Sequence, residues 1–193
     1  MTHLTPGSAL EVLGPLGNGF TEPEEMRTAL IVAGGMGVAP LRGLIHQCAQ
    51  ASSVQLHVFF GAQSAANLLF LDEIAHLGTA AVNLSTEDGS LGHQGLVTDL
   101  VQRSLQHELS ANPEQTCCFA CGPWPLLQAV ARMMSHARIA CQVALESRMA
   151  CGIGACLGCA VKRDSKAGHA ATEPAYARVC MEGPVFDAQE IAW

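Results

Sequence analysis

The chain alternates between short apolar runs and segments in which apolar residues recur every three or four positions. The apolar runs are rich in branched and aromatic residues and end at glycine or polar turns, which predicts buried strands. They occupy residues 28–34, 54–61, 80–89, 116–122 and 139–147. Strand–helix alternation repeated this often is typical of a parallel sheet covered on both faces. We therefore expect an α/β fold with a five-stranded parallel sheet.

The segments between these runs have helical spacing. We expect helices beginning at Pro40, covering 67–78 and 95–109, and following Pro123. Pro40 suits the first turn of its helix, Asn67 is a candidate cap, and Gly78 is a candidate stop.

The periodicity disappears after residue 145, and the remaining segment is rich in glycine and cysteine. This change predicts an α/β domain over 21–145 and a small cysteine-rich domain over 146–193.

Composition excludes several classes of protein. The 193 residues carry a net charge of −7, so no basic stripe is present to neutralise nucleic-acid phosphates. No apolar run reaches the ~20 residues that a membrane span needs. The first residues lack the charged and apolar regions of a secretory signal, and we expect a cytoplasmic location. The 49% hydrophobic content fits a surface buried against a partner, or simply a core rich in alanine and leucine.

Nine cysteines are many for a cytosolic chain of this size. Disulfides are uncommon in the cytosol, so these cysteines need another explanation. Their positions separate packing from chemistry. The cysteines at 48, 117, 118 and 141 lie in helical or apolar segments, where they are expected to pack as small hydrophobic side chains. The other group lies among glycines and turn residues, where packing explains little: Cys151, Cys156, Cys159 and Cys180.

The spacing of this second group is C-x4-C-x2-C, with the fourth cysteine after twenty further residues. Plant-type [2Fe–2S] proteins use this local spacing, because four thiolates must surround two irons and one short loop can supply three of them. The intervening glycines would let the loop curl and point N–H groups at the sulfurs. A structural zinc site is the alternative, although zinc sites more often show two separated C-x2-C pairs.

A glycine-rich turn, AGGMGVAP (33–40), follows the first predicted strand and precedes a helix. Glycines permit close approach of a phosphate, and the helix N-terminus favours an anion. FACGPWP (119–125), at the end of the fourth predicted strand, would face the same crevice. Glu87 and Asp88, after the third, could hydrogen-bond a ribose or shape a turn. The predicted nucleotide-binding residues are Gly34, Gly35, Gly37, Pro40, Glu87, Asp88, Cys121, Gly122 and Pro123.

The motifs GGMGVAPL and CGPWPLL resemble the two nucleotide-site motifs of the ferredoxin–NADP reductase superfamily. The resemblance implies that the first motif holds a pyrophosphate and that Cys121, in the second, borders a nicotinamide. From its setting alone, Cys121 would be a packing residue. GAQSAANLLF (61–70) places no Arg or Lys near Gln63 and Ser64, so we expect NAD rather than NADP.

ESRMACGIGACLGCAVK (146–162) and YARVCMEGPVF (176–186) resemble the electron-transfer subunit of the NAD-dependent, class 1B dihydroorotate dehydrogenases. GPLGNGF (14–20) and TEDGSLGHQGLVTDL (86–100) fit the same family. The resemblance implies that the four spaced cysteines are cluster ligands. It also implies a heterotetramer with an FMN-containing catalytic subunit, in which electrons pass from dihydroorotate through the cluster and FAD to NAD+ in pyrimidine biosynthesis.

This chain departs from the family in two places. The interval before Cys180, with KAGHAATEPA (166–175), is longer than usual and should lengthen a surface loop. Residues 1–20 resemble only the last strand of the family's FAD-binding β-barrel, so the flavin-binding motifs are expected upstream of Met1. The chain could then be a fragment, work with a separate barrel chain, or have lost flavin binding. Asn18, in GPLGNGF, could contact a flavin edge or cap a turn.

The numbers of electrons that the two cofactors exchange require a flavin. A nicotinamide exchanges two electrons as a hydride and a [2Fe–2S] cluster accepts one, so a flavin is required between them.

No catalytic side chain is assigned, since no serine has the setting of a hydrolase nucleophile. Two rival functions remain open: a reductase subunit for a hydrogenase, glutamate synthase or ferredoxin, or a non-enzymatic interaction module that bears zinc or a cluster.

Overall fold

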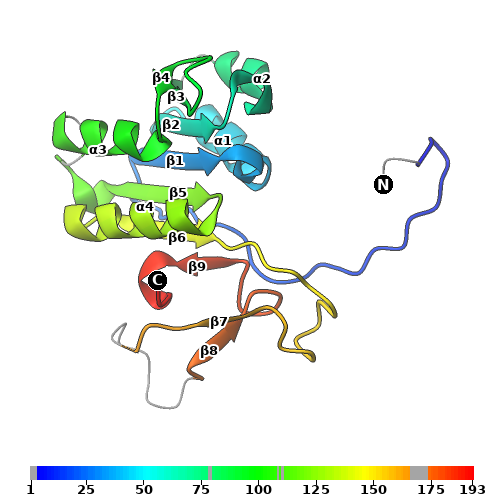
Figure 1. Ribbon diagram of the computed structural model, residues 1–193. Coiled ribbons are helices and arrows are strands. Elements are labelled where there is room, and N and C mark those ends of the chain that lie inside the picture. Colours follow the sequence, from blue (N-terminus) through cyan, green and yellow to red (C-terminus); the bar gives the residue numbers. More distant parts are fainter. Residues whose placement is uncertain (1–3, 78–79, 108, 110, 166–173) are drawn as a thin grey trace.

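The computed structural model describes residues 4–77, 80–107, 109, 111–165 and 174–193. Within these residues the chain forms a seven-stranded sheet, in the order β4-β3-β2-β1-β5-β6-β9, and a separate two-stranded sheet. Figure 1 shows the large sheet between its helices, with the small sheet below it. The large sheet therefore organises most of the fold.

The five predicted strands form the centre of the large sheet. They are β1 (Thr28–Gly34), β2 (Gln55–Ala62), β3 (Ala80–Thr86), β5 (Thr116–Cys121) and β6 (Ala140–Ala144). Every pairing among them is parallel. The predicted α/β fold with a parallel sheet is confirmed.

Two short strands that the sequence did not predict extend this sheet. β4 (His93–Gln94) pairs parallel to β3. β9 (Val185–Asp187) pairs antiparallel to β6, with Val185 opposite Ala144. The C-terminal part of the chain thus returns to the sheet of the nucleotide-binding unit.

Helices cover both faces of the sheet, and β1 directs alternate side chains to each face. Leu30 and Val32 pack with α3 (Val97–His107) and α4 (Trp124–Ala137). Ala29 and Ile31 pack with α1 (Val38–Gln50) and α2 (Leu71–Ala75). Short 3-10 turns occur at Gly35–Gly37, Ala65–Asn67, Pro113–Gln115 and Ala188–Glu190.

The predicted helix over 67–78 is wrong in its extent, because α2 is only five residues long. Asn67 does not cap it. Its side chain accepts a 2.8 Å hydrogen bond from the Ser64 hydroxyl across the preceding 3-10 turn. Phe70 precedes α2 in a left-handed conformation at φ 58°, which breaks the helix there. Gly78 lies outside the described residues.

The segment after β6 contains the cysteine loop (146–159) and the antiparallel pair β7 (Ala160–Lys162) and β8 (Tyr176–Arg178). Most of the interval before Cys180 that was expected to form a longer surface loop lies outside the described residues. In the ranges that the structure covers, no helix combines the length and apolar character required to cross a bilayer.

The N-terminal arm (4–20) extends away from the sheet, as the dark blue trace in Figure 1 shows. Residues 4–20 belong to no strand of either sheet. The arm's described residues make one isolated bridge, between Asn18 and Pro184. Leu10, Val12 and Leu13 in this arm are exposed.

Candidate functional site

A cavity of about 550 Å³ lies at the carboxyl ends of the central strands. Ligands of open α/β sheets bind at this edge. The wall comes from the turns after β1, β2 and β3 and from the starts of α3 and α4, and includes Gly34, Gly35, Gly61, Gln63, Ser85, Glu87, Thr98, Pro123 and Leu126. Its place and size suit a dinucleotide.

Four of the predicted nucleotide-binding residues line this cavity together: Gly34, Gly35, Glu87 and Pro123. Gly35 has a positive φ of 54°, which favours glycine, and it begins the 3-10 turn that continues into α1. The free N–H groups of this turn therefore lie beside the cavity, where an anion would be stabilised.

Three other predicted residues lie behind the wall. A Cβ on Gly37 would sit 2.1 Å from the carbonyl oxygen of Cys121, and a Cβ on Gly122 would sit 3.1 Å from the Cα of Gly34. These glycines let the turns after β1 and β5 touch. Cys121 is buried, and burial raises the pKa of its thiol to about 11. The thiol is therefore neutral near pH 7.

Pro40 and Asp88 lie away from the cavity wall. Pro40 is exposed in the first turn of α1. The Asp88 carboxylate accepts hydrogen bonds from the Ser90 hydroxyl at 2.6 Å and from the Ser90 N–H at 2.9 Å, and these bonds lower its pKa. Asp88 shapes the turn after β3 in this structure.

The sequence interpretation missed several wall residues, among them Ser85 and Gly61. Ser85 is fully buried in β3, and its hydroxyl has no hydrogen-bond partner among the described residues. A Cβ on Gly61 would lie 2.7 Å from Val97 and 3.0 Å from the Ser85 oxygen. A glycine at the end of the second apolar run was the available signal. Among the described residues that line the cavity, none is lysine or arginine.

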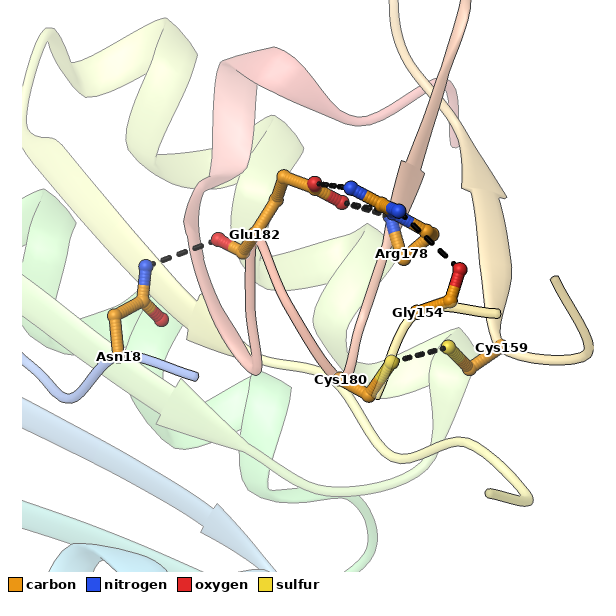
Figure 2. Close-up of polar contacts among 6 residues, drawn as sticks. All are labelled: Asn18, Gly154, Cys159, Arg178, Cys180 and Glu182. Carbon is orange, nitrogen blue, oxygen red and sulfur yellow. Dashed lines mark hydrogen bonds and ion pairs between the residues drawn. The ribbon is translucent and has the colours of Figure 1, made fainter. Parts of the chain in front are cut away.

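The four spaced cysteines form two pairs. The sulfurs of Cys159 and Cys180 are 3.3 Å apart, and both residues are buried. Figure 2 shows the contact between these two side chains. The backbone N–H of Cys156 donates to the sulfur of Cys151 at 3.4 Å. The pairs are close enough for the charge of Cys151 to act on Cys180. Among the described residues no three potential metal ligands converge on one point, so the arrangement is two thiol pairs and not a closed cage.

The backbone of the cysteine loop stabilises thiolates. N–H groups of Cys156 and Ile153 hydrogen-bond the sulfur of Cys151 and lower its pKa to about 6. The N–H of Cys180 similarly lowers the pKa of Cys159, whereas the hydrogen bond between the two thiol groups raises the pKa of Cys180. Thiolates are the form that binds metals, and N–H donors to sulfur are typical of iron–sulfur sites. The donor set therefore fits an iron–sulfur cluster.

Two family models match the two parts of the chain. Residues 31–132 match a model described as an oxidoreductase NAD-binding domain. Residues 146–192 match the iron–sulfur cluster binding domain of dihydroorotate dehydrogenase B. The second match covers the cysteine loop, β7, β8 and β9.

Curated relatives match over nearly the whole chain. The electron-transfer subunit of dihydroorotate dehydrogenase B (NAD+) from Caldanaerobacter subterraneus is 38% identical over 99% of this chain and 69% of its own length. The subunit of the same name from Desulforamulus reducens is 36% identical over 100% of this chain and 69% of its own length. The chain thus spans about two thirds of these relatives.

Solved structures share the fold. The NADH-dependent reduced ferredoxin–NADP oxidoreductase, a flavin-based electron-bifurcation system, superposes with a TM-score of 0.75 at 25% identity, covering 95% of this chain and 60% of that chain. A ferredoxin reductase of carbazole 1,9a-dioxygenase gives a TM-score of 0.54 at 18% identity, over 65% of this chain and 39% of that chain, and shows the fold alone.

Proposed function

The chain belongs to the family of electron-transfer subunits of dihydroorotate dehydrogenase B (NAD+), and from this premise we propose how it transfers electrons. Electrons pass from an FMN-containing catalytic subunit that oxidises dihydroorotate, through a [2Fe–2S] cluster and FAD, to NAD+. The observation that carries this proposal is a glycine-rich loop whose backbone N–H groups bond cysteine sulfurs, with Cys159 and Cys180 in contact beside it, attached to a nucleotide-binding sheet.

The cluster ligands in this proposal are Cys151, Cys156, Cys159 and Cys180. When bound, a [2Fe–2S] cluster accepts and releases one electron at a time. The loop supplies backbone N–H groups that offset the negative charge on the sulfurs. Cys159 and Cys180 are buried while Cys156 is exposed, so one side of the site lies at the surface. That side is where a partner subunit would approach.

NAD+ occupies the 550 Å³ cavity in this proposal. The turn at Gly34 and Gly35 binds the pyrophosphate through backbone N–H groups at the start of α1. The wall at Pro123 borders the nicotinamide, and Glu87 on the other side accepts hydrogen bonds from a ribose. A 2′-phosphate would meet the Glu87 carboxylate without a cation in the described wall, so NAD+ is favoured over NADP+.

The electron count places FAD between these two sites. NAD+ takes up a hydride, whereas the cluster delivers single electrons, and a flavin can do both. No described residue of this chain is assigned to FAD. The chain then contributes an NAD-binding domain over 21–145 and a cluster domain over 146–193 to a heterotetramer with the catalytic subunit.

Anaerobic purification tests the proposal, with and without co-expression of a dihydroorotate-oxidising subunit. Iron and acid-labile sulfide should be present in equal amounts, and dithionite should partly bleach the visible bands and produce an electron paramagnetic resonance signal. NAD+ should bind more tightly than NADP+ in calorimetric titration. A colourless protein that carries one zinc per chain would overturn the cluster, and tighter NADP+ binding would overturn the cofactor assignment.

A second partner class is favoured by one observation, the 0.75 TM-score with a ferredoxin–NADP oxidoreductase. A ferredoxin could then replace the catalytic subunit as the source of electrons. Co-purification distinguishes the two partners. Retention of a dihydroorotate-oxidising subunit supports the first, and NAD+ reduction by reduced ferredoxin alone supports the second.

A further inference from the structure

The cysteine loop is held from outside by a chain of polar contacts that begins at the N-terminal arm. Figure 2 shows Asn18 bonded to Glu182, Glu182 paired with Arg178, and Arg178 bonded to the loop at Gly154. We propose that Arg178 and Glu182 are positioning residues that hold the loop in place and, through their opposite charges, set the reduction potential of the bound cluster. This inference rests on the proposed function, because it needs a cluster at the four cysteines.

The first step is the contact between Arg178 and the loop. Arg178 ends β8, two residues before Cys180, and its Nη1 donates to the carbonyl oxygen of Gly154 at 3.2 Å. Gly154 lies between Cys151 and Cys156 and has a φ of 75°. A Cβ there would lie 2.9 Å from Arg178 Nη1 and 2.8 Å from the Met181 side chain, so the loop is packed directly on this arginine. Arg178 thus ties one pair of cysteines to the other.

The second step is the bidentate pairing with Glu182. One carboxylate oxygen of Glu182 accepts from the Arg178 backbone N–H at 2.6 Å and from Arg178 Nε at 3.1 Å. The other carboxylate oxygen accepts from Arg178 Nη2. Two parallel N–H···O bonds fix the plane of the guanidinium group, a geometry that lysine cannot reproduce. The remaining nitrogen, Nη1, is therefore aimed at Gly154.

The third step is the anchor of Glu182. Its carbonyl oxygen accepts a 3.0 Å hydrogen bond from the Asn18 amide, and the Asn18 side-chain oxygen accepts from the Val185 N–H at 3.1 Å. The Asn18 backbone N–H donates to Gly183 at 2.7 Å. A Cβ on Gly17 would lie 2.2 Å from the same carbonyl, so the arm and this turn are in contact. The turn after Cys180 is thus fixed on both sides.

The fourth step is electrostatic. The charge of Arg178 interacts with the sulfurs of Cys159 and Cys180. Arg178 and Glu182 together are neutral, so removing either leaves an uncompensated charge of known sign beside the cluster. A positive charge favours the reduced, more negative cluster, and a negative charge opposes it. About a third of each side chain is exposed, at 37% and 32%, so water screens part of this effect.

The test compares Arg178→Met, Glu182→Gln and the double variant, with Arg178→Lys as the charge-conserving variant. Arg103→Met, on the exposed side of α3, is the matched control. Three quantities are measured on anaerobically purified protein: the cluster midpoint potential by electron paramagnetic resonance titration, the rate of iron loss to a chelator, and NAD+ affinity as a check that the α/β domain is folded.

Arg178→Met should lower the midpoint potential and Glu182→Gln should raise it, each changing the ratio of reduced to oxidised cluster about threefold to tenfold at fixed potential; tenfold is 59 mV for one electron. The double variant and Arg178→Lys should stay near the wild-type potential. All four variants should lose iron to the chelator about tenfold faster than the wild-type protein, because each breaks the bidentate pairing of Arg178 with Glu182. Arg103→Met should change neither quantity.

Midpoint-potential shifts of the same sign in Arg178→Met and Glu182→Gln would overturn the claim that the two charges set the potential. An unchanged rate of iron loss would overturn the claim that the Arg178–Glu182 pair holds the loop. If a variant loses NAD+ binding, the near-isosteric Glu182→Gln decides the outcome. Absence of iron from the wild-type protein would instead reject the proposed function itself. The two failures are therefore distinguishable.

Discussion

The thiols of the central sheet and those of the cysteine loop have opposite surroundings. Cys117 and Cys121 lie in β5, where burial raises the pKa of the first to about 12 and of the second to about 11. Cys151 lies in the loop, where backbone N–H groups lower its pKa to about 6. The same side chain is a neutral packing group in one region and a ready thiolate in the other.

The difference has two causes, which are burial of the β5 thiols and the use that each backbone makes of its N–H groups. β5 is paired with β1 on one side and β6 on the other, so its N–H groups are committed to the sheet ladder. The cysteine loop has no such ladder, and its N–H groups turn toward the sulfurs with Gly152 and Gly154 at positive φ. The ionisation of each thiol therefore depends on its local backbone and burial, and the presence of a cysteine alone does not make it reactive.

The largest expected effect is loss of the metal site from the loop while the sheet is unaffected. Cys159→Ser should abolish iron binding, because the Cys159 sulfur lies 3.3 Å from that of Cys180 and a hydroxyl is a poor ligand for iron–sulfur clusters. Cys48→Ala, in the core, should keep its iron. Iron and sulfide analysis measures both, and equal iron in the two variants would contradict the division between the regions.

The next effect concerns thiol alkylation in the metal-free protein. Above pH 6, Cys151 is mostly thiolate because its pKa is about 6, whereas Cys117 stays protonated because its pKa is about 12. At pH 7.5 iodoacetamide should label Cys151 at least ~100-fold faster than Cys117, and lowering the pH to 5 should slow Cys151 about tenfold as its thiolate is protonated. Peptide mass spectrometry follows each site. Comparable labelling of both in the folded protein would refute the contrast.

A smaller effect is expected where two turns of the sheet region touch. Gly37→Ala should destabilise the fold by about 3 kcal/mol, because its Cβ would lie 2.1 Å from the Cys121 carbonyl oxygen. Gly43→Ala, at an open position in α1, should instead stabilise by about 0.5–1 kcal/mol. Denaturant unfolding measures both. The loop should hold iron equally well in each variant that folds.

The smallest expected effect is at a polar exception within the apolar sheet, Ser85. Ser85→Ala should stabilise the ligand-free protein by about 1 kcal/mol, since the buried hydroxyl has no partner among the described residues. It should weaken NAD+ binding about threefold if that hydroxyl bonds the nucleotide. Thermal unfolding with and without NAD+ separates the two terms, and a destabilised ligand-free variant would show that the hydroxyl is already satisfied.

The large sheet was predictable because each of its five central strands corresponds to an apolar run in the sequence that is long enough to recognise. β4 and β9 were not, since strands of two and three residues carry no pattern. The 67–78 helix failed because the contact between Ser64 and Asn67 and the left-handed Phe70 are local geometries that helical spacing does not reveal.

The candidate sites divide in the same way. Spacing alone predicted four cysteines at one site, but their grouping into pairs depends on the path of the loop. Gly37 and Gly122 lie behind the cavity because two turns approach each other, which no local pattern contains. Asn18 was expected to contact a flavin edge or to cap a turn, and its side chain bonds the backbone of Glu182 and Val185, which lie 164 and 167 positions away and which no local pattern could identify.

The antiparallel pairing of β9 with β6 has a consequence for transferring the cysteine-rich segment to another protein. Because Ala144 pairs with Val185 and the Leu145 N–H bonds the Pro184 carbonyl at 2.8 Å, the chain leaves and re-enters the sheet at adjacent points. Residues 145–184 form a cassette with neighbouring ends. Inserting this segment between the corresponding strands of another reductase of this fold should add the cysteine site without changing the strand order of that protein's sheet.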